Sequence, residues 1–208
     1  MTSSPRMRLL VVTQDFPPDV GGIQTYSWEL ARRLSAKASA LEVVAPARPA
    51  AAAVDRAAPF RVTRVSGRPD LLPLTGLPAV YRRARALRPD RALHAQWQTV
   101  GLSLLARRLT GWPRRIVCAA HGRELLFNPA ASVPGLRTAY DALRRGLLRR
   151  VDTFVPVSHY TARLLHDRDV APERTHVVSN GTDPDRFFPR DATALRQDLG
   201  LSDRPLLL

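Results

Sequence analysis

Short runs of apolar residues recur along the chain, and polar or amphipathic stretches separate them. Seven of these runs have the length and composition of buried strands. They cover residues 9–13, 41–45, 60–65, 91–95, 115–120, 153–157 and 175–179. Helical stretches lie between them, and this alternation predicts an α/β, Rossmann-like fold: a parallel sheet with helices on both faces.

Two of the predicted helices have a clear apolar stripe at helical spacing. The first follows Gly22, and its stripe consists of Ile23, Tyr26, Leu30 and Leu34, whereas Glu29, Arg32, Arg33 and Lys37 lie elsewhere. The second covers residues 135–150, with Leu136, Tyr140, Leu143 and Leu147 predicted inside and Arg137, Arg144, Arg145 and Arg149 predicted largely on a solvated face. We expect both helices to pack on the sheet.

Other segments mark loops and a domain boundary. Residues 46–59 are rich in alanine and proline without an amphipathic stripe, so we predict a flexible loop there. Near the end, residues 192–199 have the composition of a short helix, and residues 204–208 that of the start of an apolar strand. We therefore expect one Rossmann-like domain over residues 7–188, with residues 189–208 forming an interdomain linker and the first strand of a second domain.

Composition narrows the class of protein. The 208 residues are 45% hydrophobic and can bury a sizeable core. The net charge of +14 predicts attraction to phospholipid headgroups, nucleic acid or phosphorylated substrates. A GC-rich genome is the alternative explanation, because Lys37 is the only lysine and all other basic residues are arginine. No run approaches the roughly 20 apolar residues that cross a bilayer, so we expect a soluble or membrane-surface protein.

The most informative cluster is His121-Gly122-Arg123-Glu124, directly after the predicted strand at 115–120. Open parallel sheets bind ligands beyond the carboxyl ends of their strands. An imidazole there can hydrogen-bond a sugar or a phosphate, and a glycine allows a ligand to approach the backbone. Arg123 and Glu124 can contact or orient charged groups, although Glu124 can alternatively cap the helix that follows.

A second candidate lies at the start of the first helix. Gly21 and Gly22 precede a helix whose free amides favour a phosphate or diphosphate. Paired glycines also simply make turns, so this signal is weak by itself. The Gly-x-Gly-x-x-Gly pattern is absent, which argues against a nicotinamide or flavin cofactor.

The remaining polar motifs are explained by structural roles, such as a helix cap or a turn. Ser158 is a good N-cap for the segment through His166, and no Gly-x-Ser-x-Gly surrounds it, which disfavours a serine nucleophile. Asn180-Gly181 is typical of a turn with positive φ. The five histidines and the single cysteine, Cys118, show no familiar metal-ligand spacing, so we expect no metal site.

Taken in order, these motifs resemble the amino-terminal half of a GT-B glycosyltransferase of family 4. The resemblance rests on Asp15-Phe16-Pro17-Pro18 with Gly21-Gly22, on His121-Gly122-Arg123-Glu124, on Val157-Ser158-His159-Tyr160-Thr161, and on Asn180-Gly181-Thr182-Asp183 through Phe187 and Pro189. It spans nearly the whole chain. The sequence around Phe16 and Gly22 is most similar to the phosphatidylinositol mannosyltransferase-like branch of the family.

The resemblance implies two Rossmann-like domains facing across a cleft, with acceptor bound mainly by the first and a GDP- or UDP-linked sugar mainly by the second. Such enzymes retain anomeric configuration and need no metal or other cofactor. Gly22 would contact the donor diphosphate, and His121 the transferred sugar as the catalytic residue. Further substrate contacts are implied for Asp15, Gly21, Gln24, Arg123, Glu124, Ser158 and Asn180.

The family's second domain carries the basic residues and paired glutamates that hold the donor, and none of these follows Leu208. We therefore expect this chain alone to bind nucleotide-sugar weakly and to turn over poorly, unless a separate chain supplies the missing half. A non-catalytic domain that only pairs with a partner chain is a further alternative.

The expected location is the cytoplasm, with possible peripheral contact with an anionic membrane at its inner face and a glycan or lipid acceptor. The arginines that suggest this contact are Arg82, Arg83, Arg85, Arg107, Arg108, Arg114 and Arg115. Solvated helix faces explain them equally well. A basic, non-catalytic module for an anionic membrane surface or nucleic acid is the alternative function. We expect no nucleic-acid partner, because neither an aromatic platform nor a recognition helix is evident.

Overall fold

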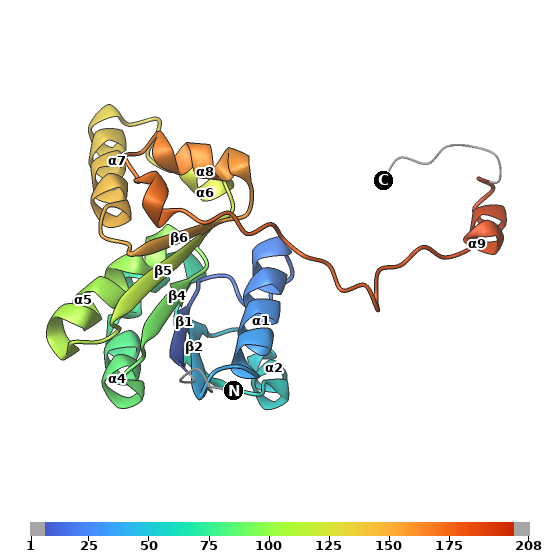
Figure 1. Cartoon of the computed structure of the whole chain (residues 1–208), viewed down its shortest axis with the longest axis horizontal. Coiled ribbons are helices and arrows are strands. Elements are labelled where there is room, and N and C mark those ends of the chain that lie inside the picture. The colour runs from blue at the N-terminus through green and yellow to red at the C-terminus, as the bar shows by residue number, and fades with distance from the viewer. Residues whose placement is uncertain (1–6, 202–208) are drawn as a thin grey trace.

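A parallel sheet of six strands forms the centre of the molecule, as the computed structural model shows for residues 7–201 (Figure 1). The strands are β1 (Arg8–Val12), β2 (Ala40–Pro46), β3 (Arg61–Val65), β4 (Arg91–His94), β5 (Arg115–Ala120) and β6 (Thr153–Pro156). Their order is β3-β2-β1-β4-β5-β6, and every pair is parallel. The predicted α/β class is confirmed.

The strand order reverses at β1. The chain moves outward from β1 through β2 to β3, then returns to place β4 on the other side of β1. In open α/β sheets, such a reversal leaves a crevice beyond the carboxyl ends of the two central strands. The loops that follow β1 and β4 therefore border the position where a ligand is expected.

Helices cover both faces of the sheet. They are α1 (Gly22–Ser35), α2 (Ala51–Ala57), α3 (Leu72–Thr75), α4 (Leu77–Leu87), α5 (Val100–Thr110), α6 (Arg123–Leu126), α7 (Pro134–Leu148), α8 (His159–His166) and α9 (Thr193–Asp198). Three 3-10 turns accompany them: η1 (Pro69–Leu71), η2 (Trp97–Thr99) and η3 (Pro172–Arg174). In Figure 1, α1 and α2 lie on one side of the sheet, with α4 and α5 on the other.

The alternation of side chains along β1 divides the core between these two layers. Leu9 and Val11 belong to the cluster that includes Ala31 of α1, whereas Leu10 and Val12 belong to the cluster with Val80 of α4. A third cluster joins β5 and β6 to α7 and α8. The inner strands β1, β2 and β5 are thus largely buried, which explains their near-continuous apolar sequences, whereas the edge strand β3 has no buried residue.

Residues 46–59 do not form a flexible loop, so this prediction was wrong. They contain α2, in which Ala51 is buried and Val54 packs against the β1–β2 cluster. Alanine has the highest helix propensity of the common residues, and packing of Ala51 and Val54 on the sheet side stabilises so short a helix.

The seventh predicted strand is also absent among the described residues. Thr175 forms an isolated bridge with Phe154, and His176 and Val178 donate backbone hydrogen bonds of 3.0 Å to Phe154 and Pro156. The segment thus follows β6 without completing a strand. Val178 is 58% exposed, so little apolar surface is buried at this edge of the sheet.

Helix α7 confirms a predicted helix but not its predicted faces. Leu136 and Leu143 are exposed, whereas Arg144, expected on a solvated face, is only 7% exposed. Arg144 is buried because the backbone carbonyls of Leu125, in α6, and Phe127, just after it, accept its hydrogen bonds. Helix periodicity alone does not reveal such polar partners.

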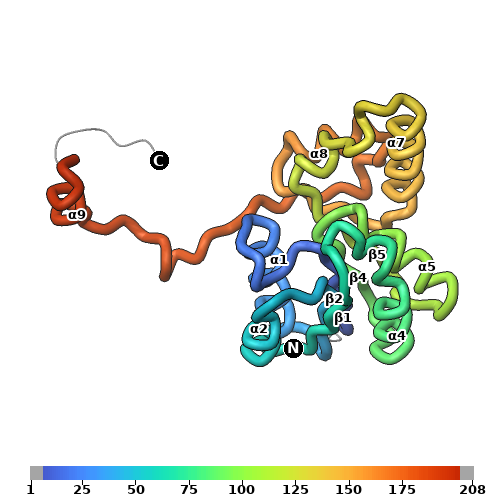
Figure 2. Tube along the Cα trace, turned by 180° about the vertical axis from the view of Figure 1, so that it is seen from behind, coloured from blue at the N-terminus to red at the C-terminus, as the bar shows by residue number. Residues whose placement is uncertain are grey.

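Beyond residue 188 the chain leaves the sheet. Figures 1 and 2 show α9 standing apart from the other helices, and none of its residues is buried. The short helix predicted at residues 192–199 is confirmed. The strand predicted at residues 204–208 lies outside the described residues.

Candidate functional site

Loops that follow β1, β4 and β5 meet at the carboxyl edge of the sheet. The rings of Tyr26, in the second turn of α1, and His121, after β5, pack edge to face with centroids 4.7 Å apart. Asp15, after β1, interacts electrostatically with His121 and is hydrogen-bonded to the side chain of Gln96, after β4. The beginning of α1 and the imidazole of His121 thus lie on the same rim.

Helix α1 begins with open amides. Gly21 occupies the N-cap position with extended backbone, and no side chain caps the helix. Gly22 is exposed, and a Cβ added to it would meet nothing within 4 Å. Free N–H groups and the helix dipole together favour an anion at this position.

Asp15 and Gln24 are tied to each other beside this helix start. The Gln24 Nε2 donates a hydrogen bond of 2.8 Å to Asp15 Oδ1. Burial and the nearby carboxylate of Asp19 raise the pKa of Asp15 above its ordinary value, although His121, Arg48 and the Gln96 hydrogen bond oppose this. The Asp15 carboxylate is therefore held in place at the rim.

His121 is half-buried and favours the neutral form. Burial lowers the pKa of its imidazole below the ordinary 6.5, and this outweighs the opposing effects of Glu124, the Ala95 backbone and Asp15. Its Nε2 is buried without a hydrogen-bond partner in the described structure. At neutral pH the imidazole is therefore uncharged, and one of its two ring nitrogens is a hydrogen-bond acceptor.

Gly122 and Glu124 shape the loop that carries His121. Gly122 has φ of 107°, a conformation that residues with side chains rarely adopt. The Oε1 of Glu124 accepts hydrogen bonds from the backbone N–H groups of His121 (2.7 Å) and Gly122 (3.3 Å). Glu124 is 6% exposed, and its carboxylate binds the backbone that precedes α6, so it does not cap the first turn of that helix as the alternative predicted.

A cavity of about 590 Å³ opens between the ends of β5 and β6. It is lined by His121, Gly122, Arg123, by the exposed apolar side chains of Leu126 and Phe127, and by Tyr160 and Thr161. Arg123 is exposed at its border. Ser158 also lines the cavity and caps α8, because its hydroxyl accepts a hydrogen bond of 3.1 Å from the Thr161 N–H.

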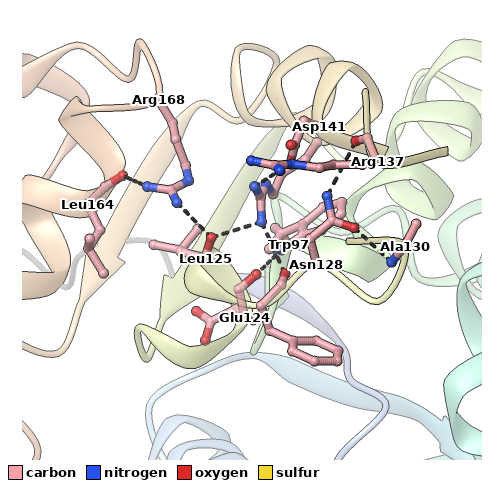
Figure 3. A network of polar contacts seen from close by, with 11 residues as sticks. Trp97, Glu124, Leu125, Asn128, Ala130, Arg137, Asp141, Leu164 and Arg168 are labelled. Atoms are coloured by element: carbon pink, nitrogen blue, oxygen red, sulfur yellow. Dashed lines mark hydrogen bonds and ion pairs between the residues drawn. The ribbon is translucent and has the colours of Figure 1, made fainter. Parts of the chain in front are cut away.

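Carbonyls at the end of α6 accept hydrogen bonds from three surrounding elements (Figure 3). Trp97 of η2 donates to the Glu124 carbonyl at 3.0 Å. Arg144 of α7 and Arg168, after α8, both donate to the Leu125 carbonyl at 2.8 Å. These bonds fix the position of α6, the short helix whose residues Arg123 and Leu126 line the cavity.

Asn180 is not brought into contact with these residues. It is exposed, and its side chain has no hydrogen bond within the part of the chain that the structure describes. Gly181 does not have positive φ, and both residues lie outside any turn, so the predicted turn was wrong. The segment is extended here because it leaves β6 without a partner strand.

Three residues of the rim were not singled out from the sequence. Tyr26 was assigned only to a core stripe, although it contacts His121. Gln96 and Trp97 follow β4 at the reversal of the sheet, and Gln96 is 8% exposed with an unpartnered Oε1. A sequence pattern could have identified Gln96 and Trp97, because a Gln-Trp-Gln run directly follows an apolar strand.

The arginines that suggested a membrane surface lie away from this rim. They belong to α4, α5 and the start of β5, whereas the rim is at the end of β5. Arg83 pairs with Glu42, Arg107 pairs with Asp152, and Arg114 packs over the Trp112 ring. Part of the predicted basic surface is thus neutralised within the molecule.

Within residues 7–201, no group of three or more His, Cys, Asp or Glu side chains is arranged to hold a metal ion. No helix in the same range is long and apolar enough to cross a membrane.

Comparison with known protein families gives one clear match. Residues 20–186 match the family described as Glycosyltransferase Family 4. A GDP-mannose-dependent alpha-(1-6)-phosphatidylinositol monomannoside mannosyltransferase of Mycobacterium tuberculosis is 33% identical over 214 residues, covering 97% of this chain and 52% of that protein. The protein of the same name from Mycolicibacterium smegmatis is also 33% identical, covering 96% of this chain and 51% of that protein.

Solved structures agree on the fold. Anabaena HepE in complex with UDP superposes with a TM-score of 0.70 at 19% identity, covering 95% of this chain and 51% of that chain. Sucrose-phosphate synthase from Thermosynechococcus elongatus gives a TM-score of 0.67 at 14% identity, with 94% and 53% covered. This chain spans about half the length of the relatives it matches.

Proposed function

Because the chain belongs to Glycosyltransferase Family 4, we propose that it forms the acceptor-side half of a retaining hexosyltransferase that uses a nucleotide-sugar donor. One observation carries this proposal: the start of α1 and His121 border the same rim, through the contact of Tyr26 with His121. A diphosphate and the sugar attached to it are neighbours in a donor, so a diphosphate site and a sugar contact must be neighbours in the protein.

The open amides at the start of α1 are proposed to bind the donor diphosphate. This group becomes the leaving group, and its negative charge grows as the sugar–oxygen bond breaks. Fixed N–H donors stabilise that charge without needing to reorganise during the reaction. Gly22 suits this role because nothing within 4 Å covers the position of its missing side chain.

His121 is proposed to position the transferred sugar. Its imidazole is neutral at neutral pH, because burial lowers its pKa, so it offers a hydrogen bond without adding charge to the site. His121 also lines the cavity between β5 and β6, from which a sugar would approach its ring. Catalysis in this arrangement depends on positioning and charge stabilisation, rather than on a strong base.

The cavity between β5 and β6 is proposed to bind the acceptor. Its exposed Leu126, Phe127 and Tyr160 offer apolar surface beside Arg123, which suits an amphipathic glycolipid. The names of the relatives favour mannose from GDP-mannose as the donor sugar and a phosphatidylinositol mannoside as the acceptor. No metal or other cofactor is proposed.

A substitution that removes one N–H group tests the donor site. Gly22 is the first residue of α1, a position that proline tolerates without breaking a helix. We expect Gly22→Pro to weaken GDP binding by about tenfold, the effect of losing one charge-assisted hydrogen bond. Gly22→Ala keeps the N–H group and should bind GDP as the unchanged chain does.

Binding is measured by two-dimensional NMR at millimolar GDP, with the amide signals of residues 23 and 24, present in both variants, as the local readout. Circular dichroism of both variants checks that α1 is intact. Equal GDP affinities of the two variants would overturn the proposed diphosphate site.

A further inference from the structure

A second cavity, of about 500 Å³, lies between α6, α7 and the end of α8. Leu126 lines both this cavity and the one beside His121, so the two are neighbours. The second cavity is lined by charged side chains, namely Arg137, Arg144, Arg145, Arg168, Asp141 and Asp167. It therefore differs in chemistry from the first, whose lining is largely apolar.

Positive charge exceeds negative charge in this cavity. Arg144 donates a hydrogen bond of 2.5 Å from Nη2 to Asp141 Oδ1, so this pair balances itself. Three guanidinium groups then face a single remaining carboxylate, that of Asp167. An anion entering the cavity meets a net attraction.

Two of the four arginines have free donors. Arg137 and Arg145 are exposed, and neither side chain has a hydrogen bond or ion pair within residues 7–201. Both lie on α7, two turns apart, along the border of the cavity. Their guanidinium groups are available to a ligand at no cost to an internal contact.

Internal hydrogen bonds to the Leu125 carbonyl hold the other two arginines close together, and Figure 3 shows these bonds. Arg144 and Arg168 converge on the Leu125 carbonyl, and the Nε atom of each is buried without a partner. Burial and the nearby charge of Arg144 lower the pKa of the Arg168 guanidinium. Bringing two like charges to one carbonyl is unfavourable, and a bound anion would relieve that repulsion.

We propose that this cavity binds a phosphate group through Arg137, Arg145 and Arg168. Guanidinium groups suit phosphate because their paired N–H donors match two of its oxygens at once. The phosphate can be a free ion or sugar phosphate, or it can be the phosphodiester of a lipid headgroup. The proposal does not depend on the transferase function, since it rests on the charge and free donors of this cavity alone.

The experiment titrates the 208-residue chain with two probes at constant ionic strength. Inorganic phosphate represents the free ion, and glycerophosphoinositol represents the headgroup phosphodiester. The Nε–H signals of Arg144 and Arg168 in two-dimensional NMR report binding at this site. We expect at least one probe to shift these signals in a saturable manner.

Two matched double variants test whether the phosphate binds in this cavity. Arg137→Gln with Arg145→Gln removes the free donors and should weaken binding by at least about tenfold. Arg82→Gln with Arg85→Gln removes the same charge from exposed positions on α4 and should leave binding unchanged. The stronger probe identifies the source of the phosphate. Absence of a saturable shift with both probes, or equal affinities for the two double variants, would overturn the proposal.

Discussion

His94 is a fully buried histidine at the end of β4, where the sheet reverses its strand order. It is 1% exposed, and its Nδ1 lies 2.8 Å from Thr99 Oγ1. Thr99 Oγ1 also lies within hydrogen-bond distance of the Val12 and Gln96 carbonyls. Thr99 thus links the imidazole to the end of β1, and burial lowers the pKa of His94 to about 3.

This burial makes stability depend on pH. In the unfolded chain, His94 gains a proton as the pH falls below 6.5, whereas in the folded chain it does so only near 3. Acid in this window therefore favours the unfolded state. We expect His94→Asn, which can keep the bond to Thr99, to reduce the pH dependence of the free energy of unfolding by about 1.4 kcal/mol per pH unit.

Urea denaturation of both proteins at several pH values between 4 and about 7 measures this difference. Parallel pH profiles of the unchanged chain and the variant would contradict it.

Arg144 also has a structural role at the residue scale. Its Nη1 donates to the carbonyls of Leu125 and Phe127, in a largely buried position. We expect Arg144→Met to lower the free energy of unfolding by about 2 kcal/mol, because buried polar groups lose their partners. Arg137→Met, at an exposed position on the same helix, should change it by less than about 0.5 kcal/mol. Chemical denaturation measures both, and equal losses would contradict the assigned role.

The sequence predicted the site unevenly at this scale. Gly22 and His121 were predicted as candidates because glycine before a helix and a polar cluster after a strand follow general rules of parallel sheets, and the structure places both at one rim. Arg144 was misassigned because the backbone carbonyls of Leu125 and Phe127, at the end of α6 and just after it, accept its hydrogen bonds, and such partners leave no periodic pattern. Gln96 was missed because the order of the strands, which brings it to Asp15, cannot be read from the strands themselves.

At the scale of elements, α4 and α5 carry exposed arginines that remain candidates for membrane contact. Arg82, Arg85 and Arg108 are exposed. We expect substitution of all three by glutamine to weaken sedimentation with phosphatidylglycerol vesicles by at least about tenfold, since each such charge contributes about 1 kcal/mol at an anionic surface.

The matched control replaces Arg32 and Arg33 on α1 and Lys37 just after it, and α1 covers the opposite face of the sheet. Vesicles of phosphatidylcholine alone should bind neither protein. If the unchanged chain binds anionic and neutral vesicles equally, membrane contact through these arginines is excluded.

Strands with a continuous apolar sequence were predicted correctly, whereas segments with a weak hydrophobic pattern were not. Six of the seven predicted strands form the sheet, because each contributes buried apolar side chains to one or two core layers. The segment at residues 175–179 has a similar composition but lies at an edge with little to pack against. Helix α2 was missed because alanine gives no amphipathic signal even where it favours a helix.

At the scale of the whole molecule, residues beyond 188 add no buried surface in the described range. Helix α9 has no buried residue, and the preceding segment is tied to α1 by the ion pair of Asp183 with Arg33 at 3.6 Å. We expect removal of residues 189–208 to leave the free energy of unfolding unchanged.

Removal of residues 170–208 is the matched comparison. It deletes Val170, which is 2% exposed, and the backbone bonds of His176 and Val178 to β6. This longer deletion should destabilise the chain clearly in urea denaturation. A large loss of stability from the shorter deletion would show that the last twenty residues pack on the domain.

The backbone of Gly122 also has a genetic consequence. Its φ of 107° makes any side chain at this position strained, although Thr161 Oγ1, 3.5 Å from where a Cβ would lie, leaves room for one. Every base change at the first or second position of a glycine codon introduces a side chain or a stop. In a mutational scan, this codon should therefore tolerate silent third-base changes while losing almost all others, even where the neighbouring Arg123 codon accepts many.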